Sequence, residues 1–187
     1  MKLIRRIMIL SLLVSCTAFV PVFSEGNGEK EGSDVQVLEG YQSVTESGIN
    51  FQWKVEGDAL HIQVMAETTG WVAVGFDPSN MMQDANILIG YVADGKAFVR
   101  DDYGVGKVKH GPDTENGGTE DVSDISGKEE DGATTLSFSI PLDSGDSTDR
   151  PLTPGSKYKV IVAMGPDGKD DFGTYHTSNR GSVEITL

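Results

Sequence analysis

Short segments in which apolar and polar residues alternate recur along this chain, and they predict β-strands. In Ala59–Met65 every second residue is apolar, which is the period of a strand with one buried face. Ile49–Val55 and Ser182–Leu187 alternate in the same way, less cleanly. No window of 11 or more residues carries a convincing helical period, so we expect no helix.

Two further segments, Trp71–Phe76 and Asn86–Ala93, are almost continuously apolar, which is typical of central strands covered on both faces. Gly and Asp cluster between the apolar segments, and the chain holds 23 glycines, as expected for tight turns. Additional strands are predicted at 97–100, Thr134–Ile140 and Tyr158–Met164. About nine strands and no helix predict an all-β protein, an antiparallel β-sandwich with a single domain.

The N-terminus has the pattern of a secretory signal. Basic residues precede an apolar stretch, and small residues at 22 and 24 predict cleavage before Glu25. A second interpretation is a lipoprotein signal that ends before Cys16, which would make Cys16 a lipid anchor. We favour the soluble form. Both interpretations place the domain outside the cytoplasm, secreted or periplasmic, and we expect no other membrane span. The predicted organisation is a signal at 1–24, a flexible acidic leader at 25–38 and one domain at 39–187.

The composition excludes several functions. A formal net charge of −14 argues against nucleic acid, because phosphate contacts need Lys and Arg. It suits a protein that docks on a basic partner, and equally one whose acidic surface only keeps it soluble. The single cysteine, Cys16, excludes an intrachain disulfide, a thiolate zinc site and the CxxCH attachment of a covalent haem.

We find no residue set for catalysis. The motifs GxSxG and HExxH and the phosphate-binding loop are absent, and the three histidines are far apart in sequence. The Asp-rich segments 77–80 and 165–171 lack the spacing of an EF-hand and are interpreted as turns, with weak calcium binding as a remote alternative. We therefore expect no independent enzyme.

Two places carry candidate chemistry. Met81 and Met82 stand in a polar loop between the two apolar strands, where a methionine is unusual as packing, although one could cap the end of the sandwich. A thioether is also a soft ligand for haem iron or copper. His176 lies in a turn rich in Thr, Ser and Asn before the last strand, near Arg180.

Taken in order, five segments resemble the DOMON family, and more narrowly its haem-binding branch, which is similar to the cytochrome domain of cellobiose dehydrogenase. They are GWVAVGF, MMQDANILIGYV, DDYGVG (Asp101–Gly106), PDTENGGTEDV (Pro112–Val122) and YHTSNRG (Tyr175–Gly181). The resemblance covers roughly residues 39–187 and implies an immunoglobulin-like sandwich. Each motif alone is weak, and the ordered set is fairly specific.

The resemblance also implies a noncovalent haem b held between a methionine and a histidine. Met82 is the implied methionine, with Met81 as the alternative, and His176 is the implied histidine. Arg180 is the candidate partner of a haem propionate, with Lys107 and Lys109 as weaker ones; His110 is a less favoured alternative to His176.

For the aromatic residues, Tyr103 and Tyr175 are expected to line the haem, and Trp71, Tyr91 and Phe98 to pack in the core. The implied function is single-electron transfer with a separate redox partner protein that has a basic docking surface. The competing hypothesis is a carbohydrate- or ligand-binding sandwich without haem.

Overall fold

The computed structural model describes residues 35–187, which form one compact unit. The predicted signal, Cys16 and most of the predicted leader lie outside the described residues. The strands are β1 Gln42–Glu46, β2 Ile49–Glu56, β3 Ala59–Ala66, β4 Val72–Phe76, β5 Asn86–Ala93, β6 Lys96–Gly106, β7 Lys109–Pro112, β8 Ser123–Glu130, β9 Ala133–Pro141, β10 Lys157–Met164 and β11 Arg180–Thr186; the one helix is α1, Asp113–Asn116.

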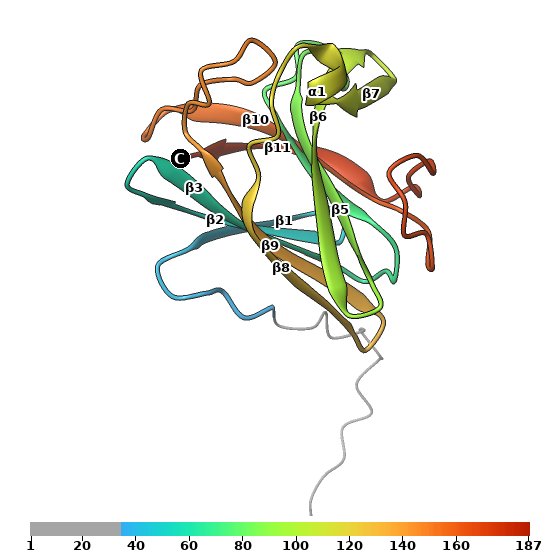
Figure 1. Cartoon of the computed structure of the whole chain (residues 1–187). Helices are drawn as coiled ribbons and strands as arrows, with labels where there is room; N and C mark the ends of the chain where they lie inside the picture. Colours follow the sequence, from blue (N-terminus) through green and yellow to red (C-terminus); the bar gives the residue numbers. More distant parts are fainter. Residues whose placement is uncertain (1–34) are drawn as a thin grey trace, which may run out of the picture. The chain divides into compact units, whose positions relative to one another are not determined.

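The strands form two antiparallel sheets, which confirms the predicted β-sandwich (Figure 1). One sheet has five strands in the order β1-β2-β3-β9-β8, and the other has six in the order β11-β10-β4-β5-β6-β7. β4 lies between β5 and β10, so the apolar segment that the sequence marks as central does occupy the middle of the six-stranded sheet.

The prediction of about nine strands and no helix was wrong in detail: residues 35–187 hold eleven strands and a four-residue helix. The clearest omission is β8, an edge strand of sequence SDISGKEE whose residues are nearly all exposed. An exposed edge strand needs no apolar alternation, and charged residues there also discourage pairing with other chains. β7 and α1 span only four residues each, too few for any period to appear.

Three hairpins turn on two residues, the second of which is glycine. In the turns Ser47–Gly48, Asp94–Gly95 and Asp131–Gly132, both residues have positive φ. That backbone is the type I′ turn, whose twist matches the twist of antiparallel strands and which favours Asp-Gly or Asn-Gly. These turns set the register of β1 with β2, β5 with β6, and β8 with β9.

The core fills the space between the two sheets. From the five-stranded sheet Leu60, Ile62 and Val64 contribute one alternating row, each at most 1% exposed, as the pattern of β3 predicts. From the six-stranded sheet Val72 and Val74 face them in the same cluster. In the part of the chain that the structure describes, no helix is long and apolar enough to cross a membrane.

Candidate functional site

A second apolar surface lies on the opposite face of the six-stranded sheet. Alternation along β4 sends Val74 to the core, so its neighbours Ala73 and Gly75 face outward. Trp71, Ala73 and Ile89 are buried there in a small cluster of their own. This is why the residues of β4 are buried on both faces although only one face meets the other sheet.

Strand register assembles this surface into the floor of a cavity of about 600 Å³. Ala73 pairs with Ile89 on one side and Ala163 on the other; Gly75 pairs in the same way with Ile87 and Ile161. A side chain at Gly75 would begin 2.9–3.1 Å from the Ile161 and Ile87 side chains. Small residues in the middle strand therefore keep the floor open between the isoleucines of β5 and Ile161 of β10.

One wall is the methionine loop, residues 77–85, which carries Met81 and Met82. Asp84 has φ of 62°, and its carboxylate accepts hydrogen bonds from Ser79 Oγ (2.5 Å) and Tyr103 Oη (3.1 Å). The hydrogen bond from Ser79 lowers the pKa of Asp84, so the carboxylate stays ionised and holds the loop.

Backbone contacts place the two methionines. The Met82 N–H donates to the Lys107 carbonyl at 3.3 Å, and the Met82 carbonyl lies so close to Gly104 that any side chain at 104 would collide with it. Both methionines line the cavity. They differ in exposure: Met82 is half-buried, whereas Met81 is 57% exposed.

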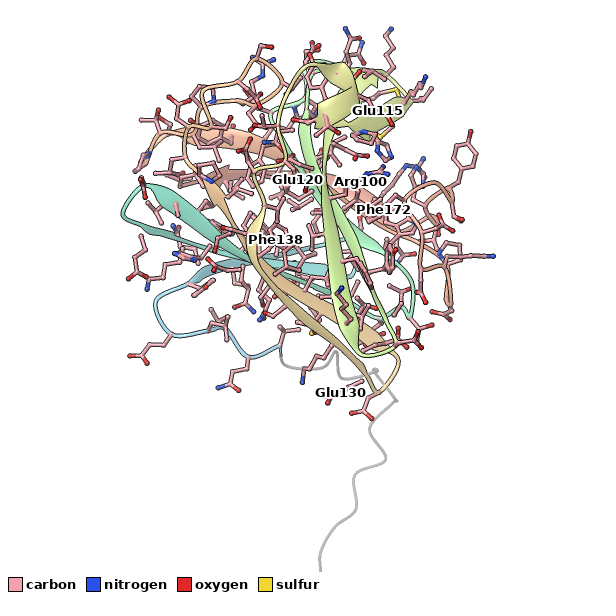
Figure 2. The ribbon with its side chains drawn as sticks, viewed as in Figure 1. Arg100, Glu115, Glu120, Glu130, Phe138 and Phe172 are labelled. Atoms are coloured by element: carbon pink, nitrogen blue, oxygen red, sulfur yellow. The ribbon has the colours of Figure 1, made fainter. Side chains whose placement is uncertain are left out.

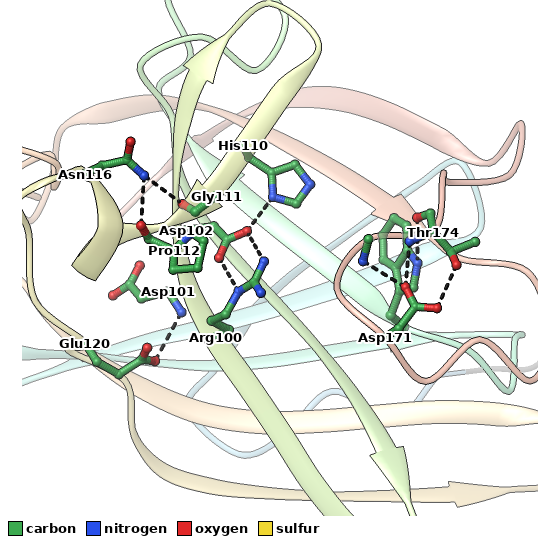
Figure 3. Close-up of polar contacts among 12 residues, drawn as sticks. Arg100, Asp101, Asp102, His110, Gly111, Pro112, Asn116, Glu120, Asp171 and Thr174 are labelled. Atoms are coloured by element: carbon green, nitrogen blue, oxygen red, sulfur yellow. Dashed lines mark hydrogen bonds and ion pairs between the residues drawn. The ribbon is translucent and has the colours of Figure 1, made fainter.

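The facing wall is the histidine loop, residues 165–179. Trp71 Nε1 donates to the Thr174 carbonyl at 3.1 Å, which fastens the loop to the sheet. Within the loop, Asp171 accepts hydrogen bonds from the Gly173 N–H and from both the N–H and hydroxyl of Thr174, as seen at the right of Figure 3. These bonds, led by that of the Thr174 hydroxyl, lower the pKa of Asp171.

His176 is half-buried at the end of this loop, and one of its ring nitrogens is engaged. Nδ1 lies 2.8 Å from the Thr177 carbonyl oxygen. A carbonyl only accepts, so Nδ1 carries the hydrogen, and in the neutral form of the ring Nε2 holds the lone pair. A neutral imidazole oriented in this way is the arrangement that a metal-ligating histidine uses.

A buried ion-pair network supports both the β6–β7 turn and the histidine loop. Asp102, whose side chain is fully buried, accepts hydrogen bonds from Arg100 Nε (2.5 Å) and Nη2 (2.7 Å), and its carboxylate lies 2.5 Å from His110 Nδ1 (Figure 3). Burial alone would raise the pKa of Asp102, but the hydrogen bonds from His110 and Arg100 hold it below its usual value. His110 also lines the cavity.

The charges around the cavity have the opposite sign to the charge of the protein. Four cationic side chains line it, those of Lys107, Lys109, Lys159 and Arg180, together with two histidines. None of its 24 lining residues is Asp or Glu, although the formal net charge of the chain is −14. An anionic group is therefore favoured at this site.

The structure brings the five predicted site residues to one cavity. Met81 and Met82 come from the methionine loop, Tyr175 and His176 from the histidine loop about 95 positions later, and Arg180 from the start of β11. Their assigned roles as ligands stay predictions. Trp71 is buried as expected, while Tyr91 and Phe98 were wrongly placed in the core: both are half-buried and stack on each other at 5.2 Å. Tyr103 binds Asp84 and is not among the lining residues.

Sequence reasoning missed the cavity floor and Phe172. The available signal was the apolar run at β4, whose burial on both faces required a second layer of covering residues. Phe172 supplies part of that cover by packing against Tyr91, with ring centres 5.0 Å apart. Its own neighbours in sequence are Asp and Gly, so nothing local indicated that it packs against the sheet.

Residues 45–165 match the model of the DOMON domain. The chain belongs to the DOMON domain family. Among curated proteins it is similar to DBH-like monooxygenase protein 1 of Mus musculus, 29% identical over 136 residues, and of Homo sapiens, 26% identical over 136 residues. Each match covers 72% of this chain and 21% of the relative, so the chain spans about a fifth of the length of these proteins.

Two solved structures share the fold. One is the cytochrome domain of Myriococcum thermophilum cellobiose dehydrogenase, with a TM-score of 0.56 over 79% of this chain and 81% of that chain. The other is the cytochrome b domain of pyranose dehydrogenase from Coprinopsis cinerea, with a TM-score of 0.57 over 78% and 81%. Both are 11% identical to this chain, so the likeness is one of fold.

Proposed function

We propose that this DOMON domain binds a b-type haem noncovalently and carries single electrons outside the cytoplasm. The observation that carries the proposal is the chemistry of the cavity: an apolar floor, a cationic rim without carboxylates, and a thioether and an imidazole in facing walls. The similarity in fold to two cytochrome domains supports it.

The floor fits the body of a porphyrin. Ala73, Gly75 and Ala163 leave a low apolar surface between the isoleucines, and the cavity volume of about 600 Å³ falls in the range of cofactor pockets. Covering this surface with a planar apolar group removes it from water, which contributes roughly 25 cal/mol per Å². A small anion such as phosphate would leave the floor uncovered.

The rim fits the carboxylates of the same group. Arg180 is exposed at the start of β11 and can present a guanidinium to a propionate as a two-pronged donor. Lys107, Lys109 and Lys159 supply further positive charge around the cavity.

The proposed axial ligands are Met82 and His176. His176 offers Nε2 because its Nδ1 is engaged by the Thr177 carbonyl. Met82 is preferred to Met81 because it is half-buried and its backbone is held by Lys107 and against Gly104. Haem iron with thioether and imidazole ligands supplies one-electron transfer at a raised reduction potential. In this proposal a redox partner protein approaches the mouth of the cavity, where Tyr175 is 85% exposed.

A visible spectrum tests the proposal. The protein, expressed with ample haem or mixed with haemin, should give a Soret band that sharpens and shifts on reduction, with resolved α and β bands. A colourless protein that also rejects haemin would overturn the proposal and leave the ligand-binding sandwich. In that case the exposed ring of Tyr175 is the surface on which to test sugar stacking.

A further inference from the structure

A cluster of acidic side chains lies near α1, away from the residues that line the cavity. It combines residues from β5, β6, α1 and the loops at 117–122 and 142–156. We call it the aspartate cluster, and its members are Asn86, Asp101, Asp113, Asp121, Asp146 and Asp149. Adjacent residues of β6 point in opposite directions: the side chain of Asp102 contacts Arg100 and His110 (Figure 3), and that of Asp101 belongs to this cluster.

The cluster contains two overlapping carboxylate triads. In the first, Asp101, Asp121 and Asp149 each place an oxygen within 4.8 Å of the others. In the second, Asp113 and Asp146 do the same with Asp149, which is shared. Asn86 joins them because its Nδ2 donates to Asp149 Oδ1 at 2.5 Å.

Several of these oxygens are buried and have no hydrogen-bond partner. Asp101 and Asp113 are 1% exposed and Asn86 is 5% exposed. Over residues 35–187, the buried side-chain atoms without a partner are Asn86 Oδ1, Asp101 Oδ1 and both carboxylate oxygens of Asp113. All four therefore belong to this one cluster. Buried polar atoms without a hydrogen-bond partner are rare in folded proteins, and a bound ion is one of the standard reasons for them.

Nothing in the described part of the chain neutralises this charge. None of the five aspartates forms an ion pair with a Lys or Arg there, unlike Asp102 one residue along β6. As a result burial, with the charges of Asp149 and Asp113, raises the pKa of Asp101 to about 9, and burial raises that of Asp113 to about 6. By contrast, hydrogen bonds from Thr148 and Thr119 outweigh burial and lower the pKa of Asp146 to about 2.

We propose that the aspartate cluster is a calcium site, with Asp149 at its centre. Every candidate ligand atom is a carboxylate or amide oxygen, which selects a hard cation. Six such side chains exceed what Mg²⁺ uses, because Mg²⁺ keeps most of its water and takes one or two carboxylates, whereas Ca²⁺ accepts six to eight oxygens in flexible geometry. The bound ion fastens α1 and the two loops to the start of β5 and to β6. This inference is independent of the haem proposal.

Calorimetric titration and thermal unfolding of the full chain test the site. After treatment with a chelator, added CaCl₂ should give a saturable heat and raise Tm by several degrees, since a ligand that binds only the folded state stabilises it. MgCl₂ at the same concentration should give a smaller rise. A Tm rise that NaCl reproduces at equal ionic strength, or no saturable heat, would overturn the proposal.

Asp149→Asn locates the site, because it keeps the shape and the acceptor for Asn86 while removing the shared charge. We expect at least tenfold weaker calcium binding. Asp94→Asn is the matched control: it makes the same charge change in an exposed hairpin turn that Asn-Gly also favours, and calcium binding should be unchanged. If Asp149→Asn does not fold, Asp121→Asn replaces it. A folded variant of either kind with wild-type calcium affinity refutes this location.

Discussion

The guanidinium carbon of Arg100 lies 4.3 Å from the centre of the Phe172 ring (Figure 2). Arg100 belongs to β6 and donates two hydrogen bonds to Asp102, while Phe172 belongs to the histidine loop. The contact therefore joins the buried ion-pair network to the loop that carries His176. A planar guanidinium can stack on a ring while it donates two hydrogen bonds to a carboxylate, whereas a lysine ammonium has no planar group to stack.

Replacing either partner should loosen the histidine loop. Arg100→Met leaves the buried carboxylate of Asp102 without the two hydrogen bonds that Arg100 donates, and removing one side of a buried ion pair costs about 3–5 kcal/mol. Phe172→Leu keeps an apolar side chain but loses the cation–π contact, at a cost of about 1 kcal/mol. Urea unfolding of the two single variants and the double variant measures the coupling. We expect a coupling energy near 1 kcal/mol, and strict additivity would show that the contact does not stabilise the fold.

Acid should weaken the histidine loop through Asp171. The pKa of this carboxyl is lower in the folded protein than its ordinary value of 3.8. Its contribution to stability is therefore complete above pH 3.8 and is lost as the pH falls through the folded pKa. Asp171→Ala should lower Tm at pH 7, and the difference from wild type should shrink below pH 4. The neighbouring Asp170 is exposed, so Asp170→Ala is the control and should change Tm little at any pH. A Tm difference for Asp171→Ala that stays constant down to pH 2 would contradict this assignment.

If the haem proposal holds, paired variants distinguish the ligands. His176→Ala should abolish the low-spin spectrum, whereas His110→Ala should retain it, because the proposal assigns His176 to the iron and leaves His110 paired with Asp102. Met82→Ala should likewise remove the spectrum and Met81→Ala should retain it. The reverse result for either pair would transfer the role to the other residue of that pair.

The core and the site were not equally visible in the sequence. The row Leu60, Ile62 and Val64 could be predicted because a strand that is buried on one face has an apolar residue at every second position. The edge strand β8 could not, because solvent covers both of its faces and sets no apolar period. Tyr91 was misplaced for a related reason: an aromatic residue in an apolar strand does not show which of two covered faces it occupies.

Site residues could be predicted where the residue type is unusual among its neighbours in the sequence. Met82 in a polar loop and His176 in a polar turn stood out against their neighbours. Asp113 and Asp149 did not, since an aspartate in a Gly- and Thr-rich loop looks like an ordinary turn residue. The burial of Asp113 and the proximity of Asp149 to Asp101 depend on how the chain folds over β6, and no local pattern encodes such a contact.

The open floor of the cavity can be tested by closing it. Gly75 stands between Ile161 and Ile87, and a larger residue there must project over the floor because both isoleucines already crowd the Cβ position. Gly75→Leu should therefore abolish haemin binding while lowering the free energy of unfolding by about 1–3 kcal/mol, the usual cost of overpacking. Circular dichroism checks that the sheet is retained, and a haemin titration measures the affinity of the site. Undiminished haemin binding by folded Gly75→Leu would place the binding surface elsewhere on the domain.

The rim of the cavity offers a complementary variant, Arg180→Glu, which keeps the floor and reverses one charge. Haemin affinity should therefore fall about tenfold or more without a change in the protein's fold.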